Sequence, residues 1–166
     1  GQARDDVNLS AMALGGMTYG VTPLELAGGY QIYANGGYFT APYCYTKVLD
    51  SRGYILLQAD TTARRVIAPE TATIINRLMQ QVTLPGGTGN GARWGNVPVA
   101  GKTGTATDDY DQWFVGITPY MITATWMGYD SPRRIQYASY PPPVVFRQLA
   151  SQLHQVGLSS LDEKPH

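Results

Sequence analysis

Three segments rich in apolar, β-branched and aromatic residues constrain the fold of this 166-residue chain more than any other feature. They span residues 97–105, 113–117 and 122–129, and Thr118-Pro119 forms a short turn between the last two. Consecutive segments of this composition, joined by short turns, are typical of antiparallel strands. The chain is therefore predicted to have an α+β fold, with an antiparallel sheet flanked by helices.

Start and stop signals predict three helices. Thr22 begins the first, because Pro23 and Glu25 follow it at the spacing of a capping box, and Asn35-Gly36-Gly37 ends it. The second begins at Pro69 and ends before Pro85. Its predicted buried positions are Ala72, Ile75, Met79 and Val82.

The last helix is predicted to follow Pro141-Pro142-Pro143 and to pack across the sheet. A frayed tail is predicted over residues 158–166. The helix is identified by apolar residues at helical spacing: Val145, Phe146, Leu149, Leu153 and Val156.

Residues 38–48 and 54–57 have the pattern of a β-hairpin on the surface. Cys44 falls within it and is predicted to be a small, partly buried strand residue. Because it is the only cysteine, neither an internal disulfide nor a cysteine metal cluster can form. The Gly-rich residues 86–91 lack the Lys-Ser/Thr pair of a phosphate loop and are predicted to be a mobile connection into the 97–105 strand.

The segment Lys102-Thr103-Gly104-Thr105 carries the chemistry of the predicted sheet. Because strand side chains alternate, Thr103 and Thr105 share one face with Val99, while Lys102 and Gly104 share the other. Gly104 permits a substrate to approach the backbone, and a flanking N–H could donate to a developing oxyanion. This arrangement suits recognition of a carboxylate and an acyl carbonyl, although four residues alone are equally typical of an edge strand with a solvated lysine.

Composition sets limits on other functions. The net charge is zero, which gives no indication of a nucleic-acid surface, and 43% hydrophobic residues suffice for one core. No apolar segment approaches the roughly 18 residues that a membrane span needs. His154 and His166 lie in no ordered motif, so neither a Ser-His-Asp triad nor a metal site is predicted, and no cofactor is expected.

The series of motifs resembles the transpeptidase domain of penicillin-binding proteins, and most of all the class A (bifunctional) enzymes. The resemblance runs from about residue 9 to about residue 153, and the Lys-Thr-Gly box is the third motif of that superfamily. It is carried, in order, by Tyr19-Gly20-Val21-Thr22-Pro23-Leu24-Glu25-Leu26-Ala27, Tyr33-Ala34-Asn35-Gly36-Gly37, residues 86–92, the Lys102 box, Trp113-Phe114-Val115-Gly116 and Trp126-Met127-Gly128-Tyr129-Asp130.

The resemblance implies a part of the β-lactamase/transpeptidase-like fold, in which two further strands come from earlier sequence. It implies that Thr103 and Thr105 bind the donor's terminal carboxylate, with Gly104 in the same substrate-binding strand. It also implies that the Thr105 N–H donates to the oxyanion. Lys102 would reach the serine of the second motif, so Lys102 and Thr105 are the expected catalytic residues.

The chain departs from the family at the nucleophile. None of its serines has a lysine three places on or an asparagine two places on, so the Ser-x-x-Lys and Ser-x-Asn motifs are absent. We therefore expect residues 1–157 to be the C-terminal part of a transpeptidase domain whose serine motifs lie upstream. The chain alone should be inactive, and the exposed sheet edge should be covered by the missing segment or by self-association.

The activity implied by the resemblance is acyl transfer from a D-Ala-D-Ala stem peptide of peptidoglycan through a serine ester. The implied partners are the stem peptide, β-lactam antibiotics and the upstream remainder of the protein. The implied location is the extracytoplasmic face of the bacterial membrane, to which the protein is held by an anchor outside this chain. Two alternatives remain. One is a non-catalytic, penicillin-recognising or regulatory module of the same fold, and the other is a hydrolytic relative such as a β-lactamase or D,D-carboxypeptidase.

Overall fold

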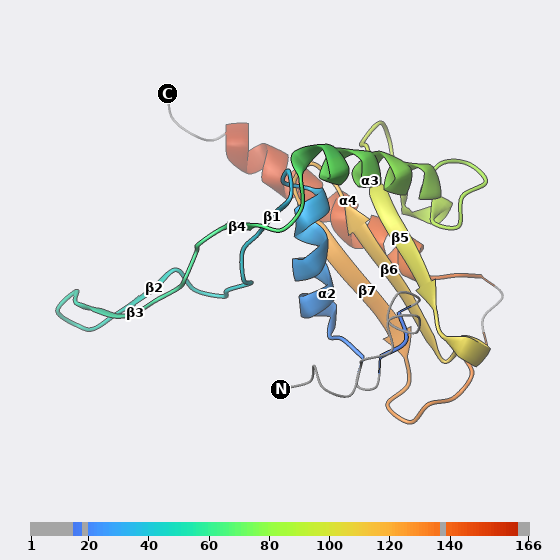
Figure 1. Ribbon diagram of the computed structural model, residues 1–166, viewed down its shortest axis with the longest axis horizontal. Coiled ribbons are helices and arrows are strands. Elements are labelled where there is room, and N and C mark those ends of the chain that lie inside the picture. Colours follow the sequence, from blue (N-terminus) through green and yellow to red (C-terminus); the bar gives the residue numbers. More distant parts are fainter. Residues whose placement is uncertain (1–14, 18–19, 137–138, 163–166) are drawn as a thin grey trace.

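The central element of the computed structural model, which describes residues 15–17, 20–136 and 139–162, is a three-stranded antiparallel sheet. Its strands are β5 (Ala100–Thr105), β6 (Asp111–Ile117) and β7 (Ile122–Gly128), in the order β5-β6-β7 (Figure 1). The predicted sheet is confirmed, with β5 beginning three residues later than residue 97. Because β6 lies in the middle, β5 is an edge strand within the described sheet.

One face of the sheet packs against the C-terminal helix α4 (Pro142–Asp162). The Phe114 ring of β6 contacts the Phe146 ring of α4 with centroids 5.2 Å apart, and Ala92, Val99 and Ala150 complete this buried cluster. Glycine permits the close approach, since a Cβ at Gly116 would lie 2.3 Å from the Phe146 ring. The fold therefore keeps position 116 free of a side chain.

The opposite face is covered by α2 (Pro23–Tyr30), which contacts β7 and β6, and by α3 (Pro69–Val82), which contacts β5 (Figure 1). Met79 of α3 packs with Ala100 and Ile117 of the sheet. Burial at this contact, with the neighbouring Tyr33, raises the pKa of Tyr30. Helices on both faces of an antiparallel sheet confirm the predicted α+β fold.

The first helix begins with the predicted capping box. The Thr22 hydroxyl accepts from the Glu25 N–H at 3.2 Å, and the Glu25 carboxylate accepts from the Thr22 N–H at 2.8 Å. The Thr22 N–H and hydroxyl both donate to the Glu25 carboxylate and lower its pKa, because they stabilise the charged form. The α-helix ends at Tyr30, earlier than predicted, and a 3₁₀ turn (Gln31–Tyr33) continues it toward the predicted stop, where Gly36 and Gly37 are left-handed.

Helix α3 has the predicted bounds and buries Ala72 and Met79, with Ile75 and Val82 half-buried. Thr83 caps its end from a fully buried position and donates its hydroxyl hydrogen to the Val99 carbonyl at 2.6 Å. This bond ties α3 to the residue that precedes β5.

Helix α4 begins at the predicted prolines and packs on the sheet, as predicted. Of the five apolar residues that identified it, only Phe146 is buried, together with Pro142, Pro143 and Ala150. The other four form an exposed line: Val145, Leu149, Leu153 and Val156. The helix also continues to Asp162, past the predicted start of a frayed tail, and residues 163–166 lie outside the described part.

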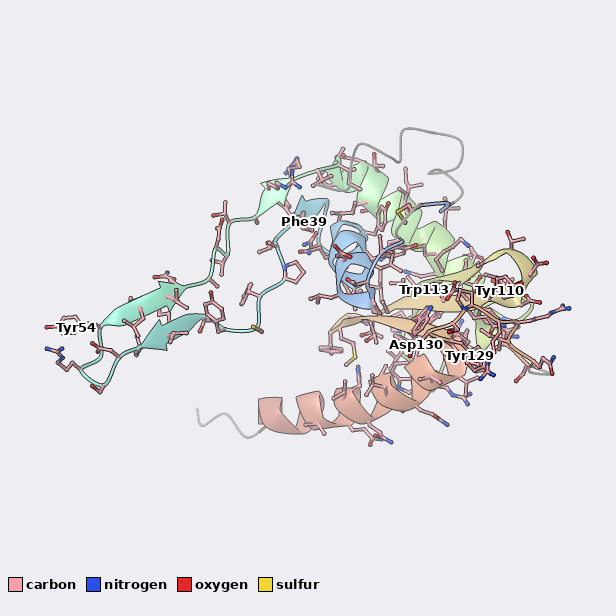
Figure 2. The ribbon with its side chains drawn as sticks, turned by 90° about the horizontal axis from the view of Figure 1, so that it is seen from below. Phe39, Tyr54, Tyr110, Trp113, Tyr129 and Asp130 are labelled. Atoms are coloured by element: carbon pink, nitrogen blue, oxygen red, sulfur yellow. The ribbon has the colours of Figure 1, made fainter. Side chains whose placement is uncertain are left out.

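The predicted hairpin is two short ladders in place of one pair of strands. β1 (Tyr38–Phe39) pairs with β4 (Arg64–Arg65), and β2 (Lys47–Leu49) pairs with β3 (Ile55–Gln58). The second ladder projects from the body, with Tyr54 at its far end (Figure 2). Pro42 interrupts the chain between the ladders, and Cys44 lies there, exposed and outside any strand. The predictions of a continuous first strand and of a partly buried Cys44 were therefore wrong.

Candidate functional site

The Lys102-Thr103-Gly104-Thr105 segment forms the C-terminal part of β5, at the edge of the described sheet. Lys102 lies opposite Val115, and Thr105 lies opposite Gln112. Among described residues β5 pairs with β6 alone. One side of the strand is therefore available to a ligand or to another strand.

The register fixes which backbone groups lie on that open side. The Ala106 N–H donates to the Asp111 carbonyl at 2.9 Å, so residue 106 points toward β6. In an antiparallel ladder alternate residues point toward and away from the neighbouring strand. Gly104 therefore points toward β6, whereas the Thr103 C=O and the Thr105 N–H point outward. Among the described residues the Thr105 N–H has no ladder partner, and the Thr103 C=O lies on the same edge two residues before it.

Lys102 is exposed, and its ammonium lies at the same edge. Nζ donates to the Thr103 carbonyl oxygen at 2.6 Å. This contact brings the positive charge from the Lys102 face of the strand to the outward backbone groups. An anion at the open edge would meet the ammonium and the Thr105 N–H together.

The two threonine side chains share a face, as predicted, but differ in surroundings. The half-buried Thr103 hydroxyl lies 2.9 Å from the Thr88 hydroxyl, and Thr105 is exposed. Thr88 belongs to the Gly-rich segment, which was predicted to be a mobile connection. In the structure this segment is a series of hydrogen-bonded turns that ends in a 3₁₀ turn (Asn90–Ala92). It is packed, since a Cβ at Gly89 would lie 2.9 Å from the Phe114 ring.

Gly104 leaves the other face of the strand open above two tryptophans. A Cβ at Gly104 would lie 3.3 Å from the Trp113 Cβ, and apart from its chain neighbours no other described residue has an atom within 4 Å of that position. The Trp113 and Trp126 rings lie 6.3 Å apart, and Trp126 donates its indole N–H to Asp111 at 2.7 Å. Any side chain at position 104 would fill space beside Trp113 that a ligand could use.

Two residues near the strand were missed by sequence reasoning. Thr88 contacts Thr103 as described above, and the Tyr140 hydroxyl reaches the backbone of Gly104 and Trp113. Thr88 lies in the 86–92 segment but was given no role there, and Tyr140 lies outside the motifs, 36 residues from Gly104 in sequence. Only a folded structure reveals such contacts.

A cavity with a volume of about 520 Å³ lies away from this segment. It is lined by Ala100 at the opposite end of β5, by Ile117 of β6, and by Asn76 and Gln80 of α3. None of Lys102 to Thr105 lines it, so we place the candidate site at the strand edge on the basis of chemistry and not of cavity size. Within the described ranges no three His, Cys, Asp or Glu side chains group in a way that could hold a metal ion.

Comparisons with known proteins identify the family. The family model for the penicillin-binding protein transpeptidase domain matches residues 2–139. The chain therefore belongs to the penicillin-binding protein transpeptidase family, and the family inferred from the ordered motifs is confirmed. The chain is 39% identical to penicillin-binding protein 1A of Clostridium acetobutylicum over 135 residues. This alignment covers 81% of the chain. The chain spans 17% of that relative's length.

Solved structures confirm the fold. The chain is similar to the D,D-transpeptidase domain of a peptidoglycan glycosyltransferase from Eggerthella lenta, with a TM-score of 0.66 and 27% identity over 83% of this chain and 33% of that one. It also has the fold of penicillin-binding protein 3 of Mycobacterium tuberculosis, solved with aztreonam. That likeness has a TM-score of 0.69 at 24% identity and covers 82% of this chain and 35% of the other.

Proposed function

We propose that this chain supplies the Lys-Thr-Gly strand of a D,D-transpeptidase that cross-links peptidoglycan stem peptides through an acyl-serine intermediate. The observation that carries the proposal is the open edge of β5, where the Thr105 N–H and the Lys102 ammonium face the same space. The family match supports it. β-lactams are proposed as inhibitors, and the aztreonam complex of a structural neighbour supports this part.

The donor would lie along the strand edge as an added strand. In this arrangement the terminal carboxylate of the D-Ala-D-Ala donor is bound by the Thr103 and Thr105 hydroxyls, with the Lys102 ammonium nearby. The acyl carbonyl oxygen accepts from the Thr105 N–H. That N–H stabilises the negative charge that develops on the oxygen as the tetrahedral intermediate forms.

The nucleophile is proposed to come from the upstream remainder of the protein, since no serine here lies in a Ser-x-x-Lys motif. Its oxygen attacks the carbonyl carbon between the two D-alanines, and the C–N bond breaks. The terminal D-alanine leaves with a proton on its amine, and the acyl group passes to an amine of a neighbouring stem peptide. In a β-lactam the broken amide belongs to the ring, so the leaving group stays attached.

We place the whole protein at the extracytoplasmic face of the bacterial membrane, where its proposed substrate lies. The described helices include none that is long and apolar enough to cross a bilayer. The proposed anchor is therefore sought outside the described residues.

The proposed role of Lys102 is tested by Lys102→Ala in the full-length protein. We expect the second-order rate of acylation by a fluorescent penicillin to fall on the order of tenfold to a hundredfold, because a charged hydrogen-bond donor is lost. Lys47→Ala is the matched control, since Lys47 is exposed on the distant β2. A parental rate in folded Lys102→Ala protein would contradict the proposed site, and an unlabelled parent protein would favour a non-catalytic module.

A further inference from the structure

We propose that Tyr140 is a positioning residue of the transpeptidase site, an inference that rests on the proposed function. Its hydroxyl lies against the rung of the sheet formed by Gly104 and Trp113. The oxygen is 2.6 Å from both carbonyl oxygens and 3.2 Å from both amide nitrogens of these residues. The single O–H donates to one carbonyl at a time, and the oxygen accepts from the amides.

The importance of this contact follows from the geometry of one peptide group. The Gly104 carbonyl and the Thr105 N–H belong to the same planar amide and point in opposite directions. The first points toward β6, where Tyr140 contacts it, and the second points to the open edge. Fixing the Gly104 carbonyl therefore fixes the direction of the Thr105 N–H, which is the proposed oxyanion donor.

The hydroxyl also strengthens that donor. Hydrogen bonds in a chain polarise one another, so donation to the Gly104 carbonyl makes the N–H at the other end of the amide more acidic. An oxyanion at the edge would therefore accept a stronger hydrogen bond. The effect is largest in the transition state, where the charge on the acyl oxygen is greatest.

Tyr140 contacts the strand from the face that carries Thr103 and Thr105, opposite the open side of Gly104. No Tyr140 atom lies within 4 Å of the position of a Cβ at Gly104, so the phenol approaches from the opposite face of the sheet. That face carries Phe114 and α4, and Tyr140 immediately precedes the three prolines at the start of this helix. Because proline restricts the backbone, the phenol is held in place before any ligand binds.

Tyr140→Phe in the full-length protein tests the inference, because it removes the hydroxyl and keeps the ring. Stopped-flow acylation by a chromogenic β-lactam gives the dissociation constant of the first complex and the acylation rate constant separately. We expect the rate constant to fall about threefold to tenfold and the dissociation constant to stay within about twofold. Tyr54→Phe, at the exposed end of the projecting hairpin, is the matched control and should change neither.

A second measurement separates positioning from a loss of folded protein. The ratio of acylation rates for an ester donor and its thiono analogue does not depend on the concentration of active enzyme. It reports on the oxyanion hydrogen bond, because sulfur accepts more weakly than oxygen. We expect the ester-to-thiono ratio to decrease in Tyr140→Phe and to stay at the parental value in Tyr54→Phe.

An unchanged acylation rate constant in Tyr140→Phe would overturn the inference. An unchanged ester-to-thiono ratio together with a larger dissociation constant of the first complex would overturn it as well. If Lys102→Ala still lowers the acylation rate as expected in that case, the proposed function survives and only the role of Tyr140 fails. If the parent protein is not acylated at all, the proposed function fails and this inference fails with it.

Discussion

Thr105 offers two groups to the proposed site, and they can be separated by one substitution. Its N–H lies at the open edge of β5, and its exposed hydroxyl lies on the face shared with Thr103. Thr105→Val removes the hydroxyl but keeps the N–H and the β-branched shape that suits a strand. The variant therefore tests carboxylate recognition without disturbing the proposed oxyanion donor.

We expect Thr105→Val in the full-length protein to lower the second-order acylation rate by a penicillin on the order of tenfold to a hundredfold. The physical reason is the loss of a hydrogen bond to a carboxylate, worth about 1.5 to 3 kcal/mol. Thr61→Val, in the exposed segment between β3 and β4, is the matched control and should keep the parental rate. An unchanged rate in folded Thr105→Val protein would show that the hydroxyl does not bind the donor.

The capping box of α2 makes a pH-dependent contribution to the stability of this helix, which packs against β7. The pKa of Glu25 is lowered in the folded state by its bonds to Thr22. A carboxyl group with a lowered folded-state pKa stabilises the fold at a pH above its unfolded pKa, and this contribution is lost as the pH falls through the folded pKa. The sign follows from the extra protons that the unfolded state binds.

We expect Glu25→Ala to lower the melting temperature of the transpeptidase domain at about pH 7. The difference from the parent should shrink toward about pH 3, as the parental carboxylate is protonated. Thermal unfolding at several pH values checks this, with Glu70→Ala in the first turn of α3 as the control. A difference that stays constant across this range would contradict a role for the charged carboxylate.

At the scale of elements, the bounds of helices could be predicted from the sequence better than their buried faces. The bounds of α3 and the start of α2 were predictable, because caps and prolines act through neighbouring residues. The buried face of α4 was not, because this helix carries two apolar lines. One contains Phe146 and Ala150, and the other contains Leu149 and Leu153. Only the position of Phe114 on the sheet decides between them.

At the scale of the whole molecule, the strand could be predicted from its motif, whereas its surroundings could not. Lys102 to Thr105 lie in an edge strand, as the spacing indicated. Thr88 and Tyr140 reach that strand from 15 and 36 residues away. Contacts of this kind depend on tertiary packing and leave no local pattern in a single sequence.

The proposed division of the site between this chain and the upstream remainder has a direct test. We expect the isolated chain to remain unlabelled by a fluorescent penicillin, because none of its serines lies in a Ser-x-x-Lys motif. Recombination with the upstream segment should restore labelling. Covalent labelling of any serine in the isolated chain, located by mass spectrometry, would contradict this division.

The projecting hairpin has a practical consequence for work on the living cell. Residues 51–58 are exposed and extend away from the end of the sheet that carries Trp113 (Figure 2). Exposed turns that make few packing contacts tolerate insertions. A fluorescent protein inserted in the turn between Asp50 and Tyr54 should therefore leave the strand edge accessible, so that the labelled protein can be followed by microscopy while it is exposed to antibiotic.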